Sequence, residues 1–325
     1  MKGYRAQLLV IALGIIILFV LRLVLGSVYI PLVDLLNPTK IEKMILFDYR
    51  LPHALTAIVA GVILSLCGLI MQSIFRNPLA GPFVLGISSG ASLVVALFFM
   101  TGFSEILSGV GVSFAAILGA LSVVILITLV SLKFSDNFTL LIFGLMLGYV
   151  FSAVQGFVQY FGEARSLKNF VVWGMGSFGN LNGTAILVLL IIATLLVFVS
   201  INVAKKLDFY SLGDDYAKLE GINVAKFKMG MLILVGISAG VLTGYCGPIA
   251  FLGLAVPHLA AMICKTKKHK IWILFTVFTG ALLALFCDII AEVPGEDVTF
   301  PINVITCMIG APVVIWVLLK TKRVF

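Results

Sequence analysis

The side chains that could do chemistry in this chain are three histidines and five cysteines, and their spacing argues against a reactive site. His53, His258 and His269 fit no HExxH pattern and have no cysteine or carboxylate at ligand spacing. The cysteines form no CxxC pair and lie in or beside apolar segments, where cysteine packs as a small hydrophobe. The sequence therefore predicts no catalytic residue, no metal site and no bound cofactor.

Ionisable groups are scarce within the apolar stretches of the chain. Such a group at membrane depth is a functional candidate, and proton-coupled carriers depend on buried acids. Only Arg22 and Asp288 lie close to such a depth, each near the end of an apolar stretch, and we expect both to snorkel or to cap at the end of a span. The sequence has no GxxxxGK[ST] nucleotide loop either. Energy for any transport must therefore come from a partner protein.

The composition of the chain predicts that the residues discussed above are carried by helices that lie in lipid. The 325 residues are 62% hydrophobic and 11% charged, with a mean hydropathy of +1.21, which is too apolar for a soluble core. About 20 helical residues cross the hydrocarbon layer. The sequence predicts an all-α, polytopic membrane protein with a single transmembrane domain over residues 1–325. Its ten segments, two of them short, are 6–25, 52–75, 88–100, 112–132, 139–161, 185–204, 229–246, 251–264, 271–290 and 304–319.

The positions of lysine and arginine predict the orientation, because cytoplasmic loops keep an excess of positive charge. Ten spans place both termini on one side, and with that side cytoplasmic, 16 of the 22 basic residues fall in cytoplasmic segments. We expect a multi-pass protein of the cytoplasmic (inner) membrane with both termini in the cytoplasm. The basic residues cluster at span ends rather than along one face, so nucleic acid is not an expected partner.

A charged segment, residues 205–228, interrupts the apolar sequence with 9 of the 36 charged residues. Ser211 and Asp214 have the spacing of a capping box, and Gly221 can end the resulting helix in a left-handed cap. Asn223 can then cap a second short helix that leads into the next span. The segment therefore predicts two short helices at the cytoplasmic surface, shaped to dock a soluble protein.

Five sequence blocks resemble one family, the FecCD-type permeases. These are membrane subunits of ATP-driven importers for iron siderophores, haem and vitamin B12. Residues 205–228 resemble their cytoplasmic coupling loop, and RLPH at 50–53 resembles RLPR. Residues 61–89 carry the MQ, NPLA and LG-S-S-GA elements. GPIAFLGLAVPH at 247–258 is close to GPIxFxGLxxPH, and residues 300–318 are similar to LPxGxxTxxxGAPxFxxLL. The chain is identified as a member of this family.

The resemblance implies a permease subunit of an ATP-driven importer, with ten helices, an inverted repeat and short coupling helices. It implies a homodimer with the substrate path on its axis, two ATP-binding cassette ATPase subunits, and an extracytoplasmic substrate-binding protein. The implied contacts to the ATPase are Ser211, Leu212, Gly213, Asp214, Asp215, Ala217, Leu219 and Gly221. The implied docking residues for the binding protein are Arg50, His53 and Glu292. The substrate stays open among siderophore, haem and cobalamin.

Two Gly-Pro pairs, at 81–82 and 247–248, each precede one of the short segments, with opposite orientation in the predicted topology. Such interruptions are typical of an inverted repeat and indicate a transport path, because freed backbone groups need protein or water as partners. The alternative role is close helix packing by small residues, which these would also serve: Gly61, Gly68, Gly86, Gly90 and Ala91. The candidate pathway residues are Asn77, Pro78, Gly81, Pro82, Gly86, Ser88, Ser89, Gly247, Pro248, Gly253, Pro257 and His258.

The chain departs from the family pattern where His53, Ala261 and Glu292 stand in place of arginines. We expect Glu292 to act with Glu296 and Asp297 as an altered charge pattern toward the binding protein.

Two other classes of function remain as alternatives. A gradient-driven secondary transporter would take up substrate without nucleotide, and a membrane enzyme would turn over a lipid-soluble substrate. The scarcity of buried acids argues against the first, and the absence of a reactive constellation argues against the second.

Overall fold

The computed structural model describes residues 4–26, 28, 30–35, 37–102, 111–134, 136–179, 181–292 and 299–321, and within these it contains helices and no strand. The all-α prediction is therefore confirmed. The elements are α1 (Arg5–Val24), α2 (Lys40–Met44), the π-helical segment η2 (Ile45–Arg50), α3 (Leu51–Phe75), α4 (Ile87–Met100), α6 (Gly111–Lys133), α7 (Asn137–Tyr160), α8 (Ala164–Gly174), α9 (Gly183–Leu212), α10 (Asp214–Leu219), α11 (Val224–Cys246), α12 (Leu252–Cys264), α13 (His269–Glu292) and α14 (Ile302–Thr321).

The described helices match the ten predicted membrane segments. Seven are long and apolar enough to cross a membrane, and three apolar helices, α4, α12 and α14, have shorter apolar stretches. Polar caps mark several starts: Asp136 accepts the Thr139 amide before α7, and Asn182 and Asn223 cap α9 and α11. The hydrogen bonds from Thr139 lower the pKa of the Asp136 carboxyl. The helices α2 and α8 lie outside the predicted set.

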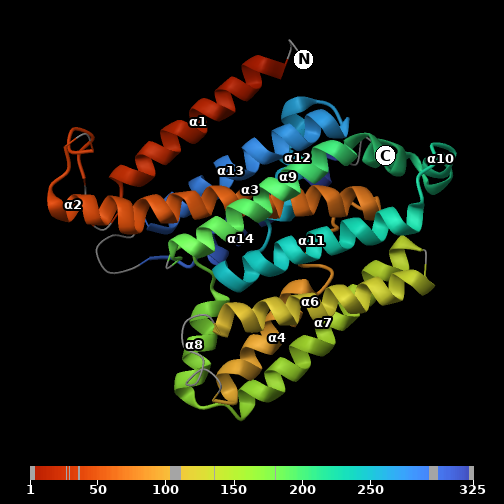
Figure 1. Ribbon diagram of the computed structural model, residues 1–325, viewed down its shortest axis with the longest axis horizontal. Coiled ribbons are helices and arrows are strands. Elements are labelled where there is room, and N and C mark those ends of the chain that lie inside the picture. The colour runs from red at the N-terminus through yellow and green to blue at the C-terminus, as the bar shows by residue number, and fades with distance from the viewer. Residues whose placement is uncertain are drawn as a thin grey trace.

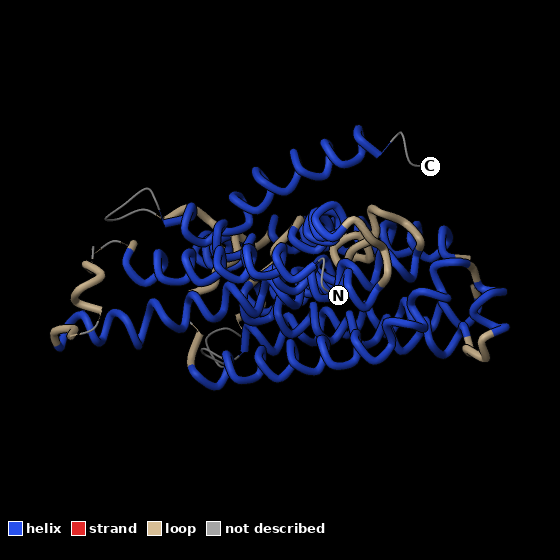
Figure 2. Tube along the Cα trace, turned by 90° about the horizontal axis from the view of Figure 1, so that it is seen from above, coloured by secondary structure: helices blue, strands red, loops and turns tan. Residues whose placement is uncertain are grey.

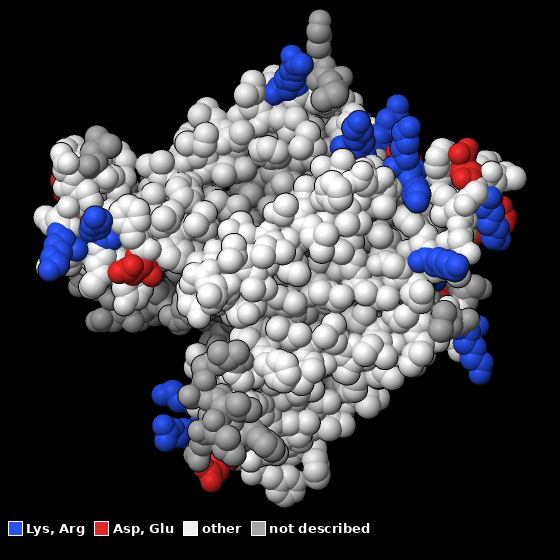
Figure 3. Space-filling view, viewed as in Figure 1, with Lys and Arg blue, Asp and Glu red and all other residues white. Residues whose placement is uncertain are grey.

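The helices run broadly along one direction, so the bundle has two ends (Figure 1). One end carries α2 and α8. The other carries α10, and α1 begins and α14 ends toward it. Figure 2 shows α14 at the margin of the bundle, where it packs against α12 and α13. Charged side chains gather at the two ends, and the broad middle of the visible face is uncharged (Figure 3). This pattern is that of a protein whose middle lies in lipid.

The helix α3 is the centre of the bundle. Every residue from Val59 to Phe75 is buried, and α3 packs against α9, α11, α12 and α13. Small residues permit these close crossings: a Cβ at Gly61 would lie 2.2 Å from the Gly280 oxygen, and one at Gly68 would lie 1.6 Å from the Gly253 oxygen. Close packing, the alternative role considered for these glycines, therefore applies to Gly61 and Gly68.

Gly68→Ala is expected to destabilise the protein, because the new methyl group meets backbone rather than a movable side chain. Overpacking typically costs about 1–3 kcal/mol, and we expect the upper part of that range. Thermal unfolding in detergent measures the loss. Gly230→Ala on α11 is the matched control, since a Cβ there meets nothing within 4 Å. Equal melting temperatures for the two variants would contradict the packing described for α3 and α12.

The charged segment folds differently from its prediction. Ser211 lies inside α9 and donates to the Leu207 carbonyl at 2.8 Å, so it does not cap a helix. The helix continues to residue 212 because Leu207 and Tyr210 extend its buried stripe. After Gly213 comes one short helix, α10, and Gly221 follows it with a φ of 75°, as predicted. Asn223 caps α11 itself rather than a second short helix.

Candidate functional site

A cavity of about 350 Å³ lies where the two Gly-Pro breaks of the chain meet. Gly81, Pro82 and Ser88 line it from the first break, and Gly253 lines it from the second. Other parts of the wall are Leu64, Phe83, Val84, Ala239, Thr243, Ile249, Ala250, Phe251, Leu254, Asn303 and Cys307. Segments more than 160 positions apart thus share one cavity, as expected for paired half-helices of an inverted repeat.

The second break is held in place by α14. The Ala250 amide donates to Asn303 Oδ1 at 3.1 Å, which satisfies a backbone group freed by the break. Phe251 adopts a φ of 67°, a positive value that is rare for a bulky residue. Its side chain packs on α14, where a Cβ at Gly310 would lie 2.4 Å from the Phe251 Cβ. A strained residue held by its surroundings at a cavity wall is a common feature of functional sites.

The first break is tied to α12 by two hydrogen bonds. His258 Nε2 lies 2.9 Å from the Pro78 carbonyl, so this nitrogen carries the proton, and Gln72 Nε2 donates to the Leu254 carbonyl at 3.1 Å. Asn77 stabilises the turn itself by accepting the Leu79 amide at 2.9 Å. The loop after α3 and the half-helix α12 are therefore joined.

Several predicted pathway residues lie beside the cavity rather than in its wall. Gly86 and Ser89 pack against α7, at Gly144 and Gly148. The Pro257 carbonyl accepts the Trp272 indole N–H at 2.7 Å. Two more predicted pathway residues, Gly247 and Pro248, lie close to Gly176. Thr243, Asn303 and Cys307 are cavity residues that the sequence did not indicate, because neither a Gly-Pro break nor a charge marks them.

Cys307 offers a direct probe of this cavity. It lines the cavity and is partly exposed, whereas the other four cysteines are buried. We expect a small thiol reagent to label Cys307 alone, and a bulky one to block uptake by filling the space. Mass spectrometry of the labelled protein and a Cys307→Ser control check both statements. Full uptake by protein that is completely modified at Cys307 with the bulky reagent would show that the cavity is not on the path.

An ionic cluster lies at the bundle end that carries α2. Arg22 and Asp288 are each 2% exposed, and Arg22 Nε donates to Asp288 Oδ2 at 2.6 Å. Arg22 also pairs with Glu292, and His53 Nε2 lies 2.9 Å from Asp288 Oδ1. The expectation that Arg22 and Asp288 snorkel or cap is wrong. They are buried and pair with each other, because α1 packs on α13.

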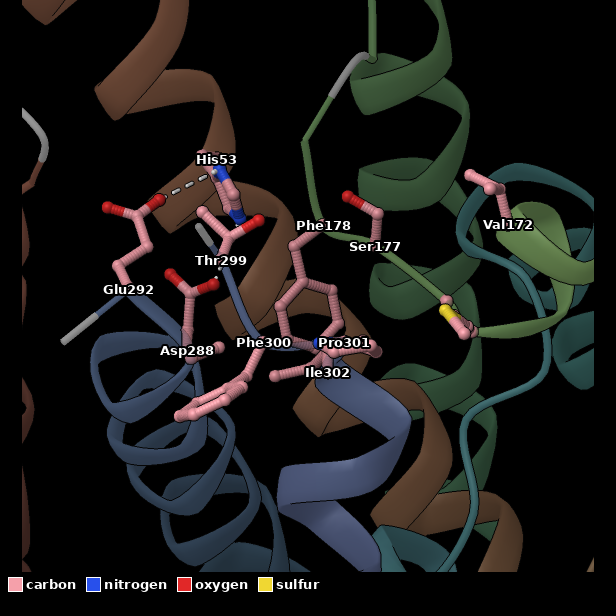
Figure 4. A pocket seen from close by; sticks show the side chains of 13 residues that line it. His53, Val172, Ser177, Phe178, Asp288, Glu292, Thr299, Phe300, Pro301 and Ile302 are labelled. Atoms are coloured by element: carbon pink, nitrogen blue, oxygen red, sulfur yellow. Dashed lines mark ion pairs between the residues drawn. The ribbon is translucent and has the colours of Figure 1, made fainter. Parts of the chain in front are cut away.

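A second cavity, of about 290 Å³, adjoins this ionic cluster. Figure 4 shows the carboxylates of Asp288 and Glu292 turned toward the His53 imidazole, with the rings of Phe178 and Phe300 beside them. His53 and Glu292 are neighbours here, with Nδ1 and Oε1 3.8 Å apart. Glu296 and Asp297 lie outside the described residues.

Arg50 does not face solvent in this structure. It is 5% exposed and donates to the carbonyls of Leu23 at 2.6 Å, Val24 at 2.9 Å and Val28. Its guanidinium thus satisfies the free carbonyls at the end of α1, where positive charge is favourable. A docking ion pair from Arg50 would require this cap to open.

The opposite end of the bundle presents α10. Leu212, Tyr216 and Leu219 project there with 66%, 60% and 84% of their surface exposed, while Ala217 is fully buried. Asp215 forms an exposed ion pair with Lys218 at 3.1 Å. Large apolar side chains on a charged, solvent-facing helix are typical of a surface that binds another protein.

Paired half-helices around a cavity, within a bundle to which the described residues contribute ten apolar helices, define a polytopic transport permease. The chain belongs to the FecCD transport family, whose model matches residues 14–320. It is 30% identical over 320 residues to the vitamin B12 import system permease protein BtuC of Salmonella typhi, covering 97% of this chain and 95% of that protein. The corresponding BtuC of Klebsiella pneumoniae subsp. pneumoniae is 30% identical over 322 residues, with 98% and 95% covered.

Two solved structures are similar in fold. One, assigned to the metal-chelate type of ABC transporter and captured in an inward-facing conformation, superposes with a TM-score of 0.88 at 28% identity, covering 98% of this chain and all of the other. The PsaBC structure from Streptococcus pneumoniae, in complex with Fab, gives 0.55 at 16% identity, with 88% and 93% covered. The chain is a permease component of an ABC-type importer and not an enzyme.

Proposed function

We propose that two copies of this chain form the membrane path of an ATP-driven importer for a metal chelate or a corrinoid. The named relatives support this ligand class, since they are vitamin B12 import permeases and a metal-chelate type transporter. Siderophore, haem and cobalamin remain the candidates, and selection among them would rest mainly with the extracytoplasmic binding protein.

The observation that carries the proposal is α10, which places exposed Tyr216 and Leu219 at one end of a bundle, and the face of that bundle seen in Figure 3 has an uncharged middle. A pair of ATPase subunits would bind here. ATP binding would close the ATPases and move residues 205–228, so that the helices rock between outward and inward access. Hydrolysis would reset them. The permease would supply shape and leverage and needs no catalytic residue or cofactor of its own.

The distribution of basic residues supports an orientation of the permease in the membrane. We place the α10 end, with both termini, in the cytoplasm and the α2 end outside, in a cytoplasmic (inner) membrane, because the excess of lysine and arginine lies at the α10 end. The binding protein would then dock near the ionic cluster at the α2 end.

A gradient-driven carrier has little support. Asp288 is the only buried acid among the described residues, and it is already paired with Arg22 and His53. Uptake into liposomes that hold the permease and its ATPase separates the two mechanisms, with cobalamin and a ferric siderophore as the probes. The proposal predicts uptake that requires ATP and binding protein and survives ionophores. Uptake without nucleotide that ionophores abolish would instead identify a secondary transporter.

Docking at the α2 end leads to a prediction for Glu292. Glu292→Gln keeps the size of the side chain and an acceptor for Arg22 but removes a charge that is 20% exposed. If this carboxylate orients the binding protein, the variant should bind it more slowly at low salt, and the difference should fade as salt increases. Surface plasmon resonance measures the association rate. Equal rates at low salt would remove Glu292 from the docking surface.

A further inference from the structure

The helix α10 is tied directly to the end of α3 by one arginine. Arg76 pairs with Asp214, the first residue of α10, and its Nε donates to the Tyr210 carbonyl at 3.0 Å. The guanidinium also lies over the Tyr210 ring, 4.9 Å from its centroid. Three contacts thus connect one side chain to both sides of the α9–α10 corner. Figure 1 shows α10 at the end of the bundle where α3 ends.

The backbone at Arg76 is specialised for this position. Arg76 ends α3 in a left-handed conformation, with φ 49° and ψ 36°, which is uncommon for a residue other than glycine. This conformation turns the chain out of α3 and into the loop 77–86. The guanidinium and the loop therefore start from the same residue, so a displacement of the side chain acts on the loop without an intervening element.

A second brace holds the other helices of this corner. Asn137, at the start of α7, donates to the Ile74 carbonyl at 2.9 Å and accepts from Lys228 of α11 at 2.6 Å. The corner is not packed solid, because a cleft of about 600 Å³ lies between Arg76, Asp214 and the start of α7. The structure therefore contains both the connection and the space in which α10 could shift.

The loop that begins at Arg76 leads to the transport cavity. Gly81 and Pro82 line the cavity, and the Pro78 carbonyl accepts from His258, so α12 and the second break are attached to the same loop. A path of direct contacts therefore runs from α10 through Arg76 to both Gly-Pro breaks. Such a path becomes a physical coupling only if the same element responds at both of its ends.

The geometry points to Arg76 as the joint of the permease, whose pairing with Asp214 carries the movement of α10 to the two breaks around the cavity. Arg76 is a positioning residue in this role, since it touches neither the cavity nor the exposed apolar surface of α10. The inference rests on the proposed function, in which an ATPase moves α10. It adds the residue pair through which that movement reaches the path.

The test follows the cavity itself, so the substrate need not be known. In the complex with its ATPase, in lipid, the labelling rate of Cys307 by N-ethylmaleimide is measured without nucleotide and after trapping with ATP and vanadate. We expect trapping to change the rate in the unaltered complex. In Arg76→Ala and in Asp214→Asn the response should be smaller by about fivefold or more, which corresponds to about 1 kcal/mol of coupling. The ATPase should remain bound and active.

Two controls separate a joint from a structural anchor. Charge reversal, with Arg76→Asp and Asp214→Arg together, should recover part of the response that Arg76→Asp alone loses. Lys206→Ala, which removes an exposed charge from the same extension of α9, should leave the response unchanged. Because Asp214 is 37% exposed, Asp214→Asn keeps the test valid if Arg76→Ala does not fold.

The outcomes distinguish this inference from the proposed function. A full labelling response in Arg76→Ala or Asp214→Asn, or no recovery on charge reversal, would overturn the joint and leave the importer intact. Loss of the ATPase from either variant would make the pair a docking anchor and would also overturn it. If the unaltered complex neither binds an ATPase nor responds to nucleotide, the proposed function fails and the joint fails with it.

Discussion

Replacing residues 213–219 with a Gly/Ser linker of equal length is expected to abolish ATP-driven uptake while the protein still inserts and folds. The linker removes α10, with its exposed Tyr216 and Leu219, and it removes Asp214, the partner of Arg76. The ATPase would then have neither a surface to bind nor a contact through which to act. Uptake into liposomes, normalised to the amount of inserted permease, measures the effect.

The membrane domain should be unaffected by this replacement, because α10 contributes one fully buried residue, Ala217, at the margin of the bundle. Gel filtration and thermal unfolding in detergent check this directly. Undiminished uptake by the linker variant would refute the coupling role of α10. Loss of the folded protein would show that α10 is instead a structural part of the bundle.

The second large effect is expected from Arg22→Met, which should lower the free energy of unfolding by about 3–5 kcal/mol. The substitution leaves the Asp288 carboxylate 2% exposed without its closest cation, at 2.6 Å in the native cluster. Removing one partner of a buried pair is costly because the other charge stays in a low-dielectric environment. Denaturant or thermal unfolding in detergent reports the loss.

Two further variants isolate the cause of this loss. Arg5→Met on the same helix removes an exposed arginine and should change stability by less than about 0.5 kcal/mol. Arg22→Met combined with Asp288→Leu removes both charges and should recover a substantial part of the loss. If the double variant is no more stable than Arg22→Met, the pair is not the reason that Arg22 is needed.

The membrane segments could be predicted because their signal is local. Hydropathy over a window of about 20 residues marks a span wherever its neighbours lie. Glycine and proline likewise mark the two short helices, because their effect on the backbone does not depend on tertiary contacts. The two breaks at 81–82 and 247–248 were therefore found from sequence, and their shared cavity agrees with the inverted repeat.

The residues that escaped prediction depend on contacts between distant parts of the chain. Arg22 and Asp288 are 266 positions apart, so nothing local distinguishes a buried pair from two snorkelling side chains. Asn303 and Cys307 reach the cavity only because α14 packs on the second break. The extension of α9 past its predicted end reflects burial of Leu207 and Tyr210, which outweighs the polar composition of that stretch.

The most direct test of the account is purification of the native complex in mild detergent, followed by ATPase assays. The account predicts that ATP-binding subunits co-purify in equal number with the permease. It also predicts that an extracytoplasmic binding protein loaded with cobalamin or a ferric siderophore stimulates ATP hydrolysis. A permease that is reproducibly recovered without any ATPase, even after crosslinking in the membrane, would contradict the account and favour a gradient-driven carrier.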